Sequence, residues 1–135
     1  MVQRLKVLRV LWSDASSGQK TVEFDLGEGR TVSCLVDGGE VVEGEVASIR
    51  EFFCLDIEGD PFESNPNAEE SVAQLSEWDV LALGRIVGSE GDSGLVDCGG
   101  IVISFSNLTD DPAAVGTWVG GVLRRLEAEL EGPAA

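Results

Sequence analysis

Apolar and polar residues alternate along the first part of the chain in three runs, at 2–12, 21–26 and 31–36. Each run is rich in Val and Leu, and alternation of this kind is typical of a half-buried β-strand. The first gap contains Ser16-Ser17-Gly18 and the second contains Gly27-Glu28-Gly29, which are typical turn sequences. We therefore expect three consecutive antiparallel strands joined by tight turns.

Alternation continues from Val41 to Ile57, but its phase changes within the run. The apolar positions of the second half have the opposite parity to Val42 and Val46: they are Ile49, Phe53, Leu55 and Ile57. A β-bulge or a bend near 47–50 accounts for this change; in a bulge, one extra residue moves every later side chain to the other face. In this register Arg50 and Phe52 point outward together.

The segment 68–77 is expected to form a short helix. Asn67 is a favourable N-cap residue, and Glu69 and Glu70 suit the positive end of the helix dipole. Three further strand-like runs follow, at 78–87, 94–98 and 101–105.

The last segment, 113–131, fits two kinds of element. Its apolar residues recur at spacings of three and four, which favours a helix, whereas each of its three internal glycines costs a helix about 1 kcal/mol relative to Ala. Alternation fits part of the same segment. We expect a strand at 117–122 that runs into a helix by Leu126.

Glycines inside two strand-like runs, Gly44 and Gly84, are typical of sharp bends or close backbone approach in a barrel. With roughly seven short strands and one or two short helices, the pattern predicts a mainly β fold. Its architecture resembles a small antiparallel barrel or curled sandwich of the oligonucleotide/oligosaccharide-binding (OB) type. The length suits a single globular domain over 1–131, with a short tail at 132–135.

Charge is the strongest compositional feature, because 25 Asp and Glu oppose nine Lys and Arg, giving a formal net charge of −16. This charge argues against nucleic-acid binding, which relies on basic side chains. The chain has no His, so it lacks the commonest general base and the commonest metal ligand. We expect no catalytic, cofactor or metal residues and a protein that is not an enzyme. Carboxylate or cysteine catalysis is the least favoured alternative.

The three cysteines, Cys34, Cys54 and Cys98, lie far apart in apolar runs, without the spacing of a metal knuckle or redox pair. We expect buried thiols in a reducing cytoplasm. We expect neither a secretory signal nor a membrane-spanning run. Two Lys against seven Arg, with abundant Gly, Ala and Val, are typical of a GC-rich prokaryotic genome.

The charge is distributed unevenly along the sequence. Residues 1–20 contain four basic residues and one acid, whereas residues 37–70 contain eleven acids and one Arg. We expect an acidic face that binds a basic protein partner, because such a face accelerates encounter and repels acidic competitors. The candidate face comprises Asp37, Glu40, Glu43, Glu45, Glu51, Asp56, Glu58 and Asp60.

Three alternatives to this use of the charge stay open. The basic first strand can pair with an acidic region of its own barrel or of a second subunit, which allows a homodimer. An OB-like barrel can bind a small polar ligand or an oligomer chain at a loop mouth, with Arg50 and Phe52 as its ligand face and loops 58–65 and 91–94 around it. The acidity can also be a solvating coat suited to high salt.

Packing in the core or at a barrel end is expected for the three tryptophans, Trp12, Trp78 and Trp118.

Overall fold

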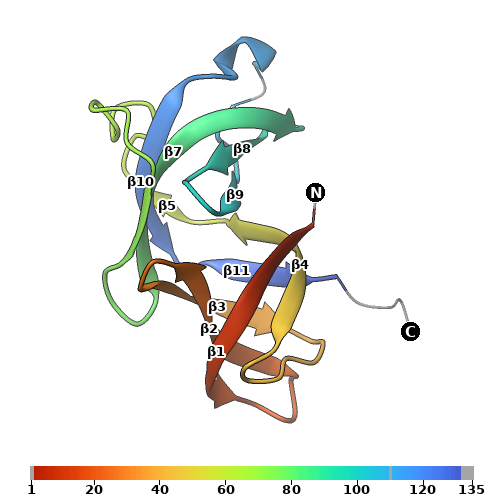
Figure 1. Cartoon of the computed structure of the whole chain (residues 1–135). Helices are drawn as coiled ribbons and strands as arrows, with labels where there is room; N and C mark the ends of the chain where they lie inside the picture. Colours follow the sequence, from red (N-terminus) through yellow and green to blue (C-terminus); the bar gives the residue numbers. More distant parts are fainter. Residues whose placement is uncertain (1, 110, 132–135) are drawn as a thin grey trace.

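The computed structural model describes residues 2–109 and 111–131, and nearly all of its regular structure is β-strand (Figure 1). Strands account for 58% of the chain, which confirms the predicted mainly β fold. More strands are described than the seven expected: β1 (Gln3–Ser13), β2 (Gln19–Gly27), β3 (Arg30–Asp37), β4 (Val46–Cys54), β5 (Ile57–Glu58), β6 (Ser71–Gln74), β7 (Asp79–Glu90), β8 (Ser93–Asp97), β9 (Val102–Phe105), β10 (Trp118–Arg124) and β11 (Glu127–Leu130). The described helical residues form one turn of 3-10 helix, η1 (Pro112–Ala114).

The predicted tail at 132–135 lies outside the described residues. No helix in the described part of the chain is long and apolar enough to span a lipid bilayer.

Five strands form a closed barrel, which occupies the lower half of Figure 1. β1 pairs with β2, β2 with β3, β3 with β11, β11 with β4, and β4 again with β1. The β3–β11 pair is parallel and the other four are antiparallel. This barrel confirms the OB-like architecture expected from the strand pattern.

The chain between β4 and β11 forms a second, curled sheet that shares β4 with the barrel. Its strand order is β4-β9-β8-β7-β10-β5, and β6 pairs with the first half of β7. Side chains from the barrel and from this sheet belong to one buried apolar cluster. The barrel and the inserted sheet are therefore packed together through a shared strand and a shared core.

β4 contains the predicted β-bulge. β11 pairs Glu129 with Glu51 but Leu130 with Ile49, so Arg50 is the extra residue of the strand. The predicted parity after the bulge is wrong, because the extra residue directs Phe52 and Cys54 into the core and leaves Leu55 68% exposed. The predicted run from 41 to 57 is also interrupted, since 41–45 is a loop containing a turn and β5 is a separate strand.

The helix predicted at 68–77 is wrong. Ala68 has a left-handed φ of 53°, and the following residues form β6, in which Val72 is buried. Pairing with β7 satisfies the backbone groups along one edge of β6. Helix preference is weak in so short a segment, so strand pairing and the burial of Val72 outweigh it.

The strand predicted at 117–122 is confirmed as β10, whereas the helix predicted from Leu126 is wrong. Arg125 has a φ of 66° and lies at the corner where the chain leaves β10 and enters β11. β11 then completes the barrel between β3 and β4. Leu126 and Ala128 are buried, which makes alternation the correct interpretation of this segment.

Gly84 lies where β7 and β8 approach closely. A Cβ atom at this position would lie 2.2 Å from the carbonyl oxygen of Asp97, so only glycine fits. The close approach predicted for Gly84 is therefore confirmed. The prediction of a strand around Gly44 is wrong, because that residue lies in the turn before β4 with a φ of 86°.

Candidate functional site

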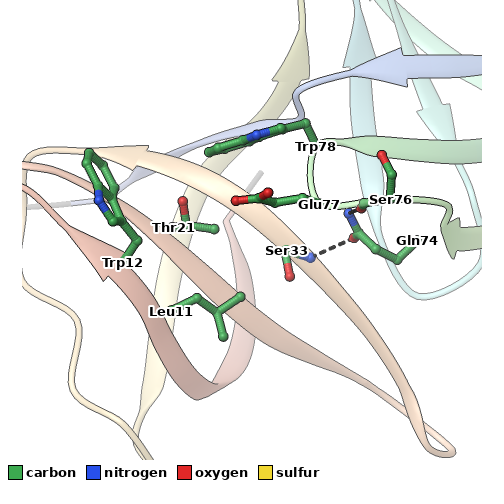
Figure 2. Close-up of a pocket in the computed structure, with 8 residues that line it drawn as sticks. All are labelled: Leu11, Trp12, Thr21, Ser33, Gln74, Ser76, Glu77 and Trp78. Atoms are coloured by element: carbon green, nitrogen blue, oxygen red, sulfur yellow. Dashed lines mark hydrogen bonds between the residues drawn. The ribbon is translucent and has the colours of Figure 1, made fainter.

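A groove of about 380 Å³ lies on the outer side of the barrel, where β1, β2 and β3 meet the hairpin of β6 and β7 (Figure 2). β1 forms one wall, β2 and β3 form the floor, and the hairpin loop forms the other wall. Small-molecule sites usually have volumes of roughly 300–1,000 Å³. The groove is lined by Leu11, Trp12, Thr21, Ser33, Gln74, Ser76, Glu77 and Trp78.

A bulge in β1 shapes the first wall. β1 pairs Val10 with Val22 and Trp12 with Thr21, so Leu11 is an extra residue. Both Leu11 and Trp12 consequently border the groove. Trp12 is 49% exposed, which leaves a large aromatic surface uncovered at this edge of the barrel.

Gln74 fixes the hairpin to the floor of the groove. Its side-chain carbonyl accepts a hydrogen bond from the Ser33 backbone N–H at 3.0 Å, and its amide donates to the Ser76 carbonyl at 2.7 Å. The Ser76 hydroxyl accepts from the Asp79 backbone N–H at 3.2 Å. These bonds hold the hairpin loop in a defined position relative to β3.

Glu77 and Trp78 lie in that loop and form the wall opposite Trp12. Figure 2 shows the Glu77 carboxylate pointing into the space between the two indole rings. Trp78 is 40% exposed. Within residues 2–109 and 111–131, Glu77 forms no ion pair and no Lys or Arg lines the groove.

Thr21 places a hydroxyl without a partner at the floor of the groove. The residue is 5% exposed, and its Oγ1 atom has no hydrogen-bond partner among the described residues. In Figure 2 this hydroxyl is directed toward the space between Trp12 and Trp78. A buried polar atom left unpaired costs about 1–3 kcal/mol. The groove therefore offers an unused hydrogen-bonding group.

A second surface lies where β3, β11 and β4 run side by side. Glu129 is directly opposite Glu51, and the parallel pairing of Ala128 with Val36 brings Asp37 next to Glu129. A hollow of about 320 Å³ lies here, with Leu35 and Phe53 among its lining residues. We call the carboxylates of this surface the acidic face: Asp37, Glu51, Glu127 and Glu129.

Within the acidic face, the Glu51 carboxylate is repelled by Glu129. Burial raises the pKa of the Glu51 carboxyl above its ordinary value, and the neighbouring Glu90 and Glu129 raise it further. In the described part of the chain, one cation forms an ion pair with this face, since an Arg50 guanidinium nitrogen lies 3.3 Å from a Glu129 carboxylate oxygen. The face keeps a net negative charge.

The eight acids predicted for a binding face fall into three groups. Two belong to the acidic face: Asp37 and Glu51. Three lie in the loop before β4: Glu40, Glu43 and Glu45. Three lie beyond the end of β4: Asp56, Glu58 and Asp60. β4 has nine residues, so the last two groups are separated by roughly 30 Å along the strand.

Some acids outside the acidic face are already engaged within the chain. Glu58 is paired with Arg124. Glu43 accepts a hydrogen bond from the Val10 backbone N–H at 2.9 Å. Asp56 lines a hollow with Asp79 and Glu127, but Arg124 and Arg125 line the same hollow. Asp37 and Glu51 are the members of the predicted set that belong to the acidic face.

Arg50 and Phe52, predicted as a ligand face, lie on different sides of β4. Arg50 is exposed, whereas Phe52 has no exposed surface and packs edge-on against Phe24, with ring centroids 5.8 Å apart. The bulge at Arg50 causes this separation by shifting the inward positions. The hollow beside the pair has a volume of only about 60 Å³.

The basic first strand is paired within its own barrel. Lys6 lies opposite Asp25, and Arg9 lies opposite Glu23 with a nitrogen–oxygen distance of 3.1 Å. Opposite charges across neighbouring strands stabilise a sheet modestly. Pairing of this strand with a second subunit stays a prediction.

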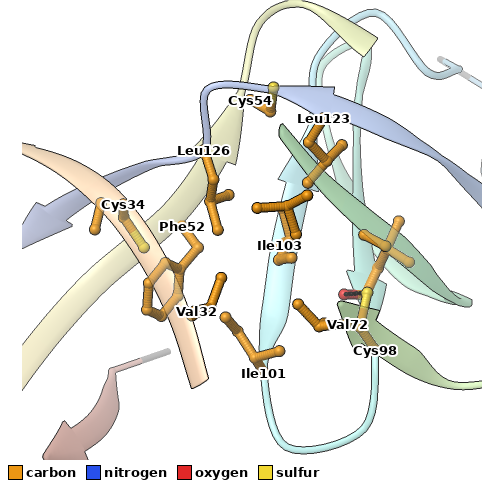
Figure 3. Packing of buried hydrophobic residues seen from close by; sticks show 14 of the residues in the cluster. Val32, Cys34, Phe52, Cys54, Val72, Cys98, Ile101, Ile103, Leu123 and Leu126 are labelled. Carbon is orange, nitrogen blue, oxygen red and sulfur yellow. Dashed lines mark hydrogen bonds between the residues drawn. The ribbon is translucent and has the colours of Figure 1, made fainter. Parts of the chain in front are cut away.

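Cys34, Cys54 and Cys98 are buried free thiols in the core (Figure 3). Burial raises the pKa of all three thiols, most strongly for Cys34 and Cys98. Thiol nucleophiles act as thiolates, and burial disfavours that form at all three positions. Among the described residues, no three Cys, Asp or Glu side chains gather closely enough to hold a metal ion.

The sequence pattern did not identify the groove. It favours core or barrel-end packing for Trp12 and Trp78, and the core alternative is wrong because each keeps a large exposed surface. One signal was available, since Trp12 precedes Ser13-Asp14 and Trp78 lies between Glu77 and Asp79. Polar neighbours of this kind are typical of strand ends and loops. Comparison of the chain with known protein families, curated proteins and solved structures finds no match.

Proposed function

We propose that the chain is a non-enzymatic binding protein that recognises a basic protein partner through the acidic face. The observation that carries this proposal is the direct register of Glu129 and Glu51 on neighbouring strands. Like charges directly opposite one another destabilise a sheet. The fold therefore retains an arrangement that costs stability, and Lys or Arg side chains of a partner would neutralise it.

Two further properties of this surface support a protein partner. Phe53, which is partly exposed, lies among the acids around the hollow, so a partner would find apolar surface next to the charge. The net charge of the chain also attracts basic proteins over a distance and speeds their encounter. Burial of the thiols disfavours the thiolate form that cysteine catalysis requires, which supports the non-enzymatic part of the proposal.

The experiment is recovery of proteins from a cell lysate at low and at moderate salt, using the purified chain as bait. We expect basic proteins to be retained at low salt and to be reduced at moderate salt. A test variant neutralises three acids of the face: Asp37→Asn, Glu51→Gln and Glu129→Gln. A matched control neutralises three exposed acids elsewhere: Glu28→Gln, Glu63→Gln and Glu69→Gln.

The two variants have the same net charge, so their difference reports location. Loss of recovery with the test variant and retention with the control would support a directed face. Equal loss with both would indicate a solvating coat in place of a binding face. Recovery of no basic protein at either salt concentration would refute the proposal.

A further inference from the structure

We infer that the groove between Trp12 and Trp78 binds an organic cation, an ammonium or guanidinium group carried on an apolar stem. This inference does not depend on a basic protein partner, because it concerns a different surface and a different contact. The shared chemistry of the ligand is a positive charge surrounded by carbon, whether it comes as a free small molecule or as a Lys or Arg side chain.

Aromatic surface is the first reason. Trp12 and Trp78 are both substantially exposed, and they lie on facing walls of one groove. Indole is the side chain that attracts cations most strongly through its π face. Two indoles with uncovered surface on opposite walls are poorly explained by packing alone, because they leave apolar area in contact with water.

Charge is the second reason. The Glu77 carboxylate points between the indoles, and in the described part of the chain neither an ion pair nor a lining cation neutralises it. A carboxylate beside aromatic rings favours a positive ligand and repels an anion. The chain's own charge of −16 acts in the same direction.

The third reason is the buried Thr21 hydroxyl, which has no partner in the described residues although it lies at the floor. A ligand N–H group can donate to this oxygen, which would satisfy it. Gln74, which also lines the groove, does not bond to this hydroxyl, because its own polar atoms already bind Ser33 and Ser76. The groove is thus held open by one set of hydrogen bonds and presents another polar group unused.

The experiment is NMR of the full chain with ¹⁵N-labelled tryptophan, which gives one indole N–H signal for each of Trp12, Trp78 and Trp118. Trp118 serves as an internal reference, because it lies outside the groove near Arg85. The probes are two cations with neutral analogues of the same shape: choline with 3,3-dimethylbutan-1-ol, and N-acetylarginine amide with N-acetylcitrulline amide.

We expect both cations to shift the Trp12 and Trp78 signals at millimolar concentration, with Trp118 unchanged and the neutral analogues at least about tenfold weaker. Stronger binding of choline would assign the site to a free cation, and stronger binding of the arginine derivative would assign it to a side chain. The inference is overturned if no cation shifts these signals at roughly 50 mM. It is also overturned if a neutral analogue, or a disaccharide such as cellobiose, binds as well as the cations.

Two variants test the named groups. Glu77→Gln should weaken the cations roughly tenfold and leave the neutral analogues unchanged. Thr21→Val should weaken the arginine derivative by roughly threefold without lowering the thermal stability, because it removes a polar atom that has no partner. Glu63→Gln is the matched control, since Glu63 is exposed and outside the groove. Equal weakening by Glu63→Gln and Glu77→Gln would contradict a local role for Glu77.

The outcome is distinguishable from that of the proposed function. The variant neutralised at Asp37, Glu51 and Glu129 should still bind the cations in the groove. Binding of a small cation without recovery of a basic protein would support the cation site and refute the protein partner. Recovery of a basic protein without binding of a small cation would support the protein partner and refute the cation site.

Discussion

The acidic face and the groove lie on the outside of the same barrel, but they use different physical interactions. The acidic face brings carboxylates together on adjacent strands, with Glu129 opposite Glu51. Its electrostatic interaction with a charged partner would be long-ranged and sensitive to salt. The groove combines two indoles with one carboxylate and is shaped by a hairpin that Gln74 fixes in place. If both proposals hold, the −16 charge of the chain acts in two ways, through crowded carboxylates on one surface and through a single carboxylate beside aromatic rings on the other.

Salt should separate the two surfaces most strongly. Raising NaCl from about 50 mM to about 500 mM shortens the screening length severalfold, so binding of a basic protein to the acidic face should weaken by about 100-fold. Binding of choline in the groove should weaken by no more than about threefold, because much of its contact is aromatic. Titration calorimetry at both concentrations measures each affinity. Equal salt dependence of both would remove the distinction.

Gln74→Leu should cost about 2 kcal/mol of the free energy of unfolding, because it leaves the Ser33 N–H and the Ser76 carbonyl without their partner. Urea denaturation measures this loss. Gln74→Glu keeps an acceptor for Ser33 and should cost less. Choline binding should fall in Gln74→Leu, whereas recovery of basic proteins should not change. A stable Gln74→Leu variant with unaltered choline affinity would show that this anchor does not position the groove.

Trp78→Ala should weaken choline binding about tenfold, which corresponds to about 1.4 kcal/mol, because it removes one of the two aromatic walls. Trp118→Leu is the matched control, since this indole lies outside the groove. Calorimetry measures both variants, with thermal denaturation as a check of folding. An equal loss in the two variants would point to general destabilisation instead of a missing wall.

Glu51→Gln should have the smallest effect and the opposite sign, raising the free energy of unfolding at pH 7 by about 0.5 kcal/mol. The folded pKa of Glu51 is raised by burial and by Glu90 and Glu129, so the folded state binds more protons between the unfolded and folded pKa values. Stability contributed by this group therefore falls as pH rises through that window. The gain from Gln should disappear near pH 3, where the carboxyl is protonated. Thermal denaturation across pH tests this, and a gain that persists at pH 3 would contradict it.

Much of the fold could be predicted from the alternation of apolar and polar residues, because side chains that face the core recur at every second position of a half-buried strand. The first three strands, the bulge in β4 and the strand group after residue 78 are all expected from the pattern. The helix at 68–77 fails because weak local preference at Asn67 and Glu69 competes with a tertiary partner, β7, that the sequence does not reveal.

The candidate surfaces are harder to predict, because each joins segments that are distant in the sequence. The acidic face includes Glu127 and Glu129 of β11. Their place on the outer surface can be predicted only if this segment is known to be a strand of the barrel. The groove brings Trp12 from β1 to Trp78 in the β6–β7 loop. It also depends on the bulge at Leu11, which turns two successive side chains toward it. No local pattern contains this information.

The pairing of β3 with β11 has a consequence for how the chain acquires its structure. Leu35 pairs with Glu127, so more than half of the chain lies between two strands that must meet. Contacts of such long sequence separation slow folding, because the closure entropy is lost before the contact forms. During synthesis from the N-terminus, β3 and β4 emerge well before β11 and expose the edges that it later covers. We therefore expect the inserted sheet to delay barrel closure, and the acidic face, which includes Glu127 and Glu129 of β11, to form only when that strand pairs with β3 and β4.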